Sequence, residues 1–165
     1  QLVRQCTLVS GNLATNLLLE AVGVAAVDRV CARAGSGESV RLRRGIQDTP
    51  AGEHGLRNTV TARGLALVMA MLAAGATAAD RALEELLRGQ EHRDQIPAGL
   101  PAGLTIANKT GWIDGVSHDM AIIRGAPERK DSVMVICLTE SGSEDELAAR
   151  VAAQAAQLWE WGPTS

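Results

Sequence analysis

The sequence predicts an α+β fold in which helices come first, a small antiparallel sheet follows and one helix ends the chain. Two observations predict it. Apolar residues recur at helical spacing through most of residues 13–89, and three short segments of alternating apolar residues follow at close spacing. The chain has 165 residues, enough for one domain with its own core. Because it contains three Trp but no Phe or Tyr, alanine, leucine and valine must build most of that core.

The first hundred residues are predicted to hold helices joined by loops. The Ser10–Asn12 stretch offers N-cap candidates for the first helix, and Gly35 stops the second. In the last of them, leucines turn inward while Asp80, Glu84 and Glu85 are expected to face solvent. The predicted helices cover Leu13–Val22, Ala25–Ala34, a stretch from near Thr61 to Gly75 that Asn58 or Thr59 could cap, and one from Thr77 or Ala78 to near Gly89.

Residues 35–58 lose the helical spacing and are rich in Gly, Pro and charged residues. They are predicted to form one long loop, and loops of that length inside a compact domain are usually functional. The cluster of Arg41, Arg43 and Arg44 is interpreted as solvated surface of this loop.

The remaining residues predict three strands and a helix. Leu104–Thr110, His118–Arg124 and Ser132–Thr139 are the strands, with a turn around Asp114-Gly115, and short connections favour an antiparallel meander. Ser143 is the expected N-cap of a last helix that runs to about Trp161. Trp159 and Trp161 are expected to form its core contact and its cap.

Composition excludes several classes of partner. The net charge of −3 gives no basic patch of the kind that binds nucleic acid. The longest apolar stretch, Gly64–Thr77, is too short to span a bilayer and is predicted to be a buried helix. Cys6, Cys31 and Cys137 lack metal-ligand spacing and are expected to be buried thiols, with one disulfide between two of them as the alternative. We therefore expect no metal, no organic cofactor, no nucleic acid and no membrane span.

Two short motifs point to chemistry. Ser10-Gly11-Asn12 stands at a predicted helix start, and Lys109-Thr110-Gly111 stands at the end of the first predicted strand. Each motif alone is common, but this order on these elements is much more specific. Together they resemble two of the three signature motifs of class A β-lactamases and penicillin-binding proteins. The family usually has Ser-Asp-Asn in the first motif, so Gly11 replaces an Asp, while Ala14, Asn16 and Leu17–Leu19 match the run that commonly follows.

The resemblance covers essentially the whole chain. The Arg57–Ala66 segment is similar to the start of the family's helix after its omega loop, and Lys109–Ile123 is similar to its hairpin beside the active site. It implies a β-lactamase/transpeptidase-like fold in one partial domain. Residues 1–100 would form the helical part, with an omega-type loop at 35–58, and residues 101–165 would form the sheet and terminal helix.

The resemblance also assigns roles. In this family a serine attacks the substrate carbonyl and forms an acyl-enzyme. Ser10 would relay a proton to the leaving nitrogen, and Asn12 would hydrogen-bond a catalytic lysine and the substrate amide. Lys109 would attract an anionic carboxylate and hold the Ser10 proton network.

Three neighbouring residues would bind the substrate. Thr110 would hydrogen-bond the substrate carboxylate, and Gly111 would allow close approach to the strand. The backbone N–H of Trp112 would be one oxyanion-hole donor. Trp112 occupies a position that is usually small in the lactamases, so it would narrow the cleft or favour another acyl substrate.

The sequence departs from the family pattern in two further places. It contains no Ser-x-x-Lys, since neither Lys109 nor Lys130 follows a serine at that spacing. The nucleophile would then precede Gln1, which leaves half an active site and an exposed edge strand. The loop lacks the usual Glu-x-x-Leu-Asn; Asp48 lies nearest the position of the Glu that activates the deacylating water, so efficient deacylation is in doubt.

Three functions stay open at this point. The first is a class A β-lactamase-related serine hydrolase, the second a penicillin-binding-type peptidase or esterase, and the third a degenerate non-catalytic binding protein. The expected partner is a small molecule, a β-lactam or a peptidoglycan-like acyl donor, bound by a protein that is monomeric when complete. The resemblance implies a periplasmic or extracellular location. His118 and Asp119 are interpreted as a hairpin pair that supports the turn, with acid–base work as the alternative.

Overall fold

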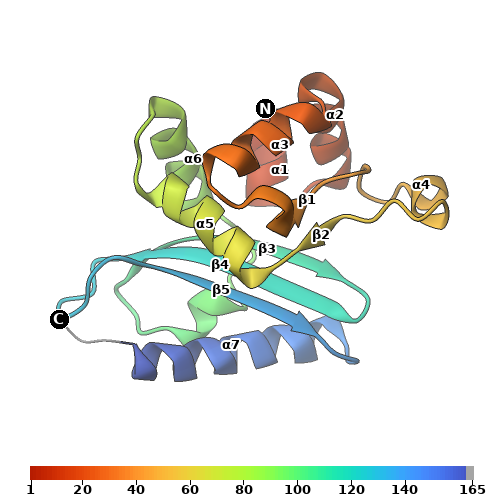
Figure 1. Cartoon of the computed structure of the whole chain (residues 1–165). Coiled ribbons are helices and arrows are strands. Elements are labelled where there is room, and N and C mark those ends of the chain that lie inside the picture. Colours follow the sequence, from red (N-terminus) through yellow and green to blue (C-terminus); the bar gives the residue numbers. More distant parts are fainter. Residues whose placement is uncertain (163–165) are drawn as a thin grey trace.

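The computed structural model describes residues 1–162 and has the predicted α+β architecture. Figure 1 shows three layers: a helical cluster, a three-stranded sheet and the long C-terminal helix on the other side of the sheet. The helices are α1 (Leu2–Leu8), α2 (Asn12–Val22), α3 (Val24–Arg33), α4 (Thr49–Glu53), α5 (Ala62–Ala73), α6 (Ala78–Arg88) and α7 (Glu144–Trp161), with short 3₁₀ turns η1 (Gly37–Ser39) and η2 (Ile96–Gly99). The strands are β1 (Val40–Arg41), β2 (Thr59–Val60), β3 (Thr105–Ile113), β4 (Val116–Arg124) and β5 (Ser132–Thr139).

The main sheet is the predicted antiparallel meander in the order β3-β4-β5. The β3–β4 hairpin is longer than predicted, because pairing continues to Ile113↔Val116 at the edge of the turn. Gly115 has a positive φ of 71°, which its lack of a Cβ makes easy. In this register Thr110 is the partner of Asp119, so the end of the Lys-Thr-Gly motif lies directly across from β4. Within the described part of the chain, β3 and β5 form the two edges of this sheet.

Each face of the sheet carries its own apolar cluster. On the α7 side, Ile106 and Ile123 of the sheet pack with Val151 and Ala155 of the helix. On the helical-cluster side, Ala107 and Ile122 pack with residues of α5 and α6. Adjacent residues of one strand thus serve different layers, as the alternation of a pleated strand requires. Because of the same alternation, Lys109 belongs to the helical-cluster face and Asn108 to the α7 face.

The predicted caps fail at two helices: no side chain caps α2, and α5 has another cap than expected. Thr61 caps α5 by accepting a hydrogen bond from the N–H of Gly64, so the expectation of Asn58 or Thr59 was wrong. Asn58 holds the preceding loop instead. Thr77 and Asp80 form a capping box at α6, and Ser143 and Glu146 form another at α7.

Two acidic residues of α6 are buried, contrary to the expectation that they face solvent. Asp80 is 5% exposed and Glu84 is 6% exposed. Asp80 serves the capping box and accepts a hydrogen bond of 2.8 Å from Arg33. Glu84 accepts hydrogen bonds from Arg124 Nε and Nη2 at 2.7 and 2.8 Å and from Arg88 at 3.0 Å. The helical spacing of the apolar residues predicted that both carboxylates face solvent. They are buried instead because arginines from distant elements, Arg33 and Arg124, bind them.

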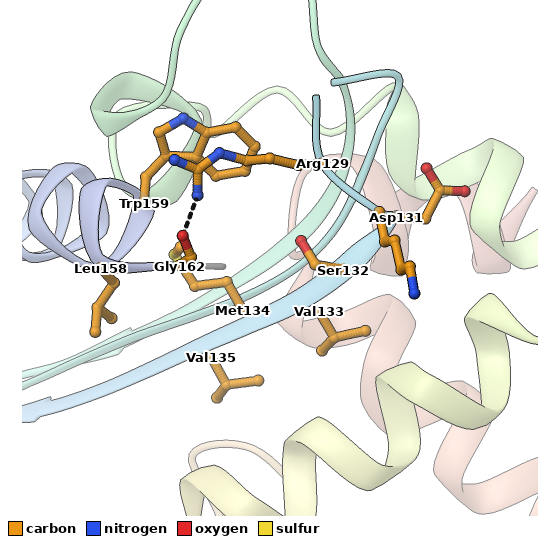
Figure 2. Close-up of a pocket in the computed structure, with 10 residues that line it drawn as sticks. Arg129, Asp131, Ser132, Val133, Met134, Val135, Leu158, Trp159 and Gly162 are labelled. Carbon is orange, nitrogen blue, oxygen red and sulfur yellow. Dashed lines mark hydrogen bonds between the residues drawn. The ribbon is translucent and has the colours of Figure 1, made fainter. Parts of the chain in front are cut away.

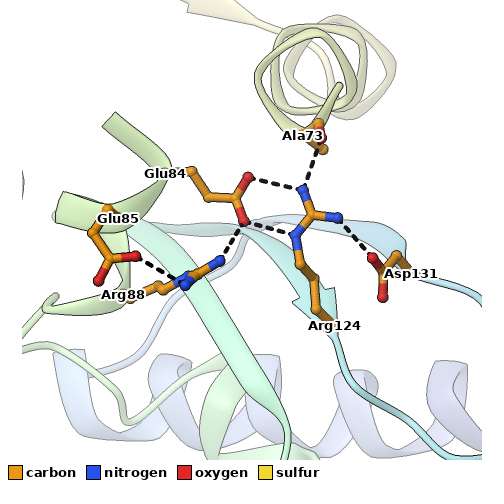
Figure 3. Close-up of polar contacts among 6 residues, drawn as sticks. All are labelled: Ala73, Glu84, Glu85, Arg88, Arg124 and Asp131. Atoms are coloured by element: carbon orange, nitrogen blue, oxygen red, sulfur yellow. Dashed lines mark hydrogen bonds and ion pairs between the residues drawn. The ribbon is translucent and has the colours of Figure 1, made fainter. Parts of the chain in front are cut away.

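The cluster around Arg124 connects three elements (Figure 3). Its guanidinium also donates to the backbone oxygen of Ala73 at the end of α5 and to Asp131 in the β4–β5 connection, both at 2.7 Å. The Arg124 hydrogen bond holds the pKa of the Glu84 carboxyl below its usual value, despite burial. This cluster fixes α5 and α6 to the sheet.

Residues 35–58 are a long connection, as predicted, but they include the short elements η1, β1 and α4. Two asparagines fix the connection. Asn16 of α2 binds both backbone groups of Ile46, at 2.7 Å to its N–H and 3.0 Å to its carbonyl. Asn58 accepts from the N–H groups of Arg43 and Arg44 at 2.7 and 3.1 Å and donates to the carbonyl of Arg44.

Two further expectations need correction. All three cysteines are free, but only Cys31 is buried; Cys6 is half-buried and Cys137 is exposed. Trp159 packs against the core as expected, whereas Trp161 is 78% exposed. Gly64–Thr77 begins inside α5 and extends past its end, so the expectation of a helix there is met over α5.

Among residues 1–162, no single helix is both long enough and apolar enough to cross a bilayer. Helices α5 and α6 are long and apolar enough only when they are counted together, and the chain bends by 110° between them.

Candidate active site

Ser10 and Lys109 come together although 99 positions separate them in the chain. Ser10 lies in the junction between α1 and α2, and Lys109 lies in β3. The ammonium Nζ of Lys109 donates a hydrogen bond to the hydroxyl Oγ of Ser10 and a second one, of 2.6 Å, to the carbonyl of Thr110. The two motifs singled out in the sequence therefore form one polar site.

The backbone of Ser10 is unusual. Its φ is +53°, in the left-handed region that non-glycine residues seldom occupy. The N-cap of α2 is Gly11, and no side chain caps this helix. The interpretation of Ser10 as a simple helix cap therefore fails, because its hydroxyl is used by Lys109 instead. Strained backbone at a polar contact is typical of functional sites.

Lys109 is charged only at a cost. Burial lowers the pKa of its ammonium group below the usual value, while the charges of Cys6 and Asp119 act in the opposite direction. A lysine with a lowered pKa exchanges its proton more readily near neutrality. Because its Nζ donates to Ser10, the Ser10 hydroxyl keeps its own proton available for another acceptor.

Cys6 is a further group, just before the α1–α2 junction, that the sequence did not indicate. It lies in α1 and accepts a hydrogen bond of 3.2 Å from the hydroxyl of Thr15 in α2. A negative charge on its thiol would raise the pKa of Lys109. A lone cysteine at no recognisable spacing gave no signal of this in the sequence.

The residues after Lys109 follow the outer edge of the sheet. Thr110 is half-buried, Gly111 is exposed and Trp112 is 44% exposed. A Cβ on Gly111 would meet nothing within 4 Å, so the face of the strand is open at this position. An edge strand with open space beside it can take up an extended or amide-containing ligand.

The structure places the other two predicted catalytic residues, Asn12 and Asp48, in different surroundings. Asn12 is the first residue of α2, close in sequence to Ser10, and its side chain is exposed. Asp48 is the N-cap of α4, where its carboxylate accepts from the N–H of Ala51 at 3.1 Å. Figure 1 shows α4 at the outer tip of its loop, apart from the sheet. The structure thus does not bring Asp48 to the Ser10–Lys109 pair.

Asp119 was expected to support the hairpin turn, and this expectation was wrong. Its side chain is 1% exposed and accepts hydrogen bonds from the N–H of Ile96 at 3.0 Å and from Asn108 Nδ2 at 3.3 and 3.4 Å. Burial raises the pKa of Asp119 to about 7. The alternation of the strand could have predicted this burial, because Asp119 lies on the same face of β4 as the buried residues Ala121 and Ile123.

One hollow of the described residues lies elsewhere. It measures about 760 Å³ and lies between β5 and the end of α7, lined by apolar side chains such as Met134 and Leu158. Figure 2 shows Arg129 over the ring of Trp159, at 4.7 Å from its centroid, with its guanidinium bonded to the carbonyl of Gly162. Neither Ser10 nor Lys109 lines this hollow. Within residues 1–162, no group of three or more His, Cys, Asp or Glu could hold a metal ion.

The helical cluster, the antiparallel sheet and the Lys109–Ser10 contact between the two motifs define an α+β protein with a polar site at the edge of its sheet. Comparison with known proteins gives the family. The model of Beta-lactamase2, described as the Beta-lactamase enzyme family, matches residues 1–160. A β-lactamase from Streptomyces lavendulae is 32% identical over 154 residues. The chain belongs to the β-lactamase enzyme family.

Solved structures agree in fold. A β-lactamase from Burkholderia vietnamiensis superposes with a TM-score of 0.86 at 28% identity, covering 97% of this chain and 61% of its own. A putative class A β-lactamase from Rhodopseudomonas palustris gives 0.84 at 26% identity, with 98% and 64% covered. A β-lactamase from Sphaerobacter thermophilus gives 0.80 at 28% identity, with 98% and 63% covered.

The chain is shorter than these relatives. The match to the β-lactamase from Streptomyces lavendulae includes 87% of this chain and 50% of that relative, so the chain spans about half of the relative's length. The solved structures share the fold of nearly all of this chain, which includes the sheet, the terminal helix and the helical cluster.

Proposed function

We propose that these residues form the proton-relay and substrate-carboxylate part of a class A β-lactamase-related serine hydrolase, which acts through an acyl-enzyme on β-lactam amide bonds. The observation that carries the proposal is the hydrogen bond from Lys109 Nζ to Ser10 Oγ. A protein needs no such contact to fold, because both groups give up part of their hydration and Ser10 adopts a strained backbone to form it.

The chemistry follows from the contact. A nucleophilic serine, supplied by residues outside these 165, gives its hydroxyl proton to a general base that also lies outside them, attacks the lactam carbonyl and forms an ester while the C–N bond breaks. The leaving nitrogen takes the proton of the Ser10 hydroxyl, and the ammonium of Lys109 returns a proton to Ser10. Lys109 and Thr110 bind the substrate carboxylate, Asn12 its side-chain amide, and the Trp112 N–H the oxyanion. We further propose export to the periplasm or the exterior, where such substrates occur.

Asp48 favours a second candidate, a penicillin-binding-type peptidase or esterase. Its carboxylate is occupied as the cap of α4, and it makes no hydrogen bond with Ser10 or Lys109. A base displaced by even 1 Å loses about a hundredfold in rate. Acylation without fast deacylation would leave the drug attached for long times.

The test is the intact mass of the natural protein that contains these residues, recorded at intervals after mixing with benzylpenicillin. A gain equal to the mass of the drug is expected, and its decay time separates a lactamase from a penicillin-binding type. Asp48→Asn is expected to leave that decay unchanged if Asp48 only caps α4. No adduct at saturating drug would overturn the β-lactam proposal and leave the non-catalytic binding protein.

A further inference from the structure

Asn16 ties the loop of residues 35–58 to α2. Its side-chain amide accepts from the N–H of Ile46 at 2.7 Å and donates to the carbonyl of Ile46 at 3.0 Å. Gly45 packs against the same amide, since a Cβ on Gly45 would lie 3.0 Å from Asn16 Oδ1. The backbone of position 46 is therefore held against the helix, and its side chain takes no part in this attachment.

The attachment lies close to the Ser10–Lys109 pair. Asn12 is the first residue of α2 and comes shortly after Ser10 in the chain. Asn16 lies one turn further along the same face of the helix, about 6 Å from Asn12 along its axis. The attachment therefore holds Ile46 within about two helical turns of Ser10.

The residues beside Ile46 offer no base to the site. Gly45 has no side chain, and the guanidinium of Arg44 turns back into the loop, where it donates to two backbone carbonyls at 3.0 and 3.1 Å. Gln47 carries a neutral amide and has a φ of +61°, which marks a sharp turn of the chain. Asp48 follows this turn and caps α4. Ile46 is therefore the free side chain at the point where the loop is fixed to α2.

The nearest carboxylates lie toward the other end of α2. A second hollow, of about 610 Å³, runs between the loop and this helix, and its lining extends from Asn16 and Ile46 to Glu20, Asp48 and the Gly23 that ends the helix. Glu20 lies one further turn beyond Asn16, about 12 Å along the axis from the start of α2. Both acidic side chains thus border the part of the hollow that is farther from the site.

Release of an acyl group from a serine needs a base beside a water molecule. The water adds to the ester carbonyl and gives a proton to the base, and the serine oxygen then leaves and takes up a proton. The base must lie within about 3 Å of that water. The side chain of Ile46 has no lone pair to accept the proton, and because it is 36% exposed it presents apolar surface instead.

We propose that position 46 decides how fast the acyl-enzyme is hydrolysed, and that isoleucine at this position makes the protein a slow-releasing, penicillin-binding type. The apolar side chain borders the acyl group and leaves the attacking water without a base. This assignment rests on the acyl-enzyme of the function proposed above. It names Ile46, and not Asp48, as the loop residue that determines the fate of the bound acyl group.

Ile46→Glu in the natural protein that contains these residues tests the proposal by a gain of function. After reaction with benzylpenicillin and removal of the free drug, the decay of the adduct is followed by intact mass. The adduct of the parent is expected to persist, and Ile46→Glu is expected to shorten its half-life at least about tenfold, since a positioned general base contributes about 10²–10⁴-fold. The gain should vanish below about pH 4, where the introduced carboxylate is protonated. Both hydrogen bonds to Asn16 are kept, because they use the backbone of position 46.

Ile46→Gln is the matched control, because it has the same shape as the glutamate variant but no base. It is expected to release the drug as slowly as the parent, and so is Asp48→Asn. An unchanged half-life in Ile46→Glu, an equal gain in Ile46→Gln or a slower release in Asp48→Asn would each overturn this proposal alone. No adduct in any of the four proteins would overturn the hydrolase proposal and the role of position 46 with it.

Discussion

The ammonium group of Lys109 donates a hydrogen bond to the hydroxyl of Ser10, which precedes it by 99 positions in the chain. The contact joins the helical cluster to the edge strand of the sheet. It places a partly desolvated cation beside a hydroxyl held by strained backbone. Such arrangements serve function at some cost in stability.

Lys109→Met tests that cost. Because burial disfavours the ammonium form of Lys109, an apolar side chain of similar length is expected to leave the free energy of unfolding unchanged or raise it by up to about 1 kcal/mol. Urea denaturation at pH 7 measures the change, with Lys130→Met as the exposed control. A loss above about 2 kcal/mol would show that the contact is needed for folding.

Arg124→Ala is expected to destabilise the chain strongly. Glu84 would remain buried without its main partner, which costs about 3 kcal/mol for a buried pair. Arg150→Ala provides the control, since its ion pair with Glu140 is about half exposed on both sides and is expected to contribute little to stability. Chemical denaturation compares the two variants. Equal losses would contradict a special role for the cluster of Figure 3.

Asp119 makes stability depend on pH near neutrality. Its pKa is raised from 3.8 to about 7 in the folded chain, so the folded state binds more protons than the unfolded state between those values. The free energy of unfolding should therefore fall as pH rises from about 4 to about 7. Asp119→Asn should flatten this part of the profile, whereas Asp114→Asn should keep it. A free energy of unfolding that rises with pH over this range in the parent chain would contradict this prediction.

Asn16→Ala is expected to loosen residues 42–58. Two hydrogen bonds to the backbone of Ile46 are lost, at a cost of about 1–2 kcal/mol, because both groups of Ile46 then need new partners. Limited proteolysis followed by mass spectrometry should show faster cleavage in this segment. Asn12→Ala, on the same helix but with an exposed side chain, should be cleaved like the parent. Similar cleavage of both variants would show that Asn58 alone holds the segment.

Much of this fold could be predicted because it depends on local pattern. The strand Ser132–Thr139 and the cap at Ser143 follow from alternation and capping chemistry between near neighbours. The burial of Glu84 could not be predicted, because it depends on Arg124, which is 40 positions away. The same limit applies to the site. The two motifs predicted Ser10 and Lys109 as residues of the site. The strained φ of Ser10 and the burial of Asp119 could not be predicted, because they arise only when distant elements pack together.

The most direct test of the Ser10–Lys109 pair is the rate at which the natural protein containing these residues forms a penicillin adduct, followed by intact mass. The account predicts a drug-mass adduct in the parent. It further predicts that Ser10→Ala and Lys109→Ala slow its formation by about a hundredfold or more, as loss of a positioned proton-transfer group does. An adduct that forms equally fast in all three proteins would contradict the account.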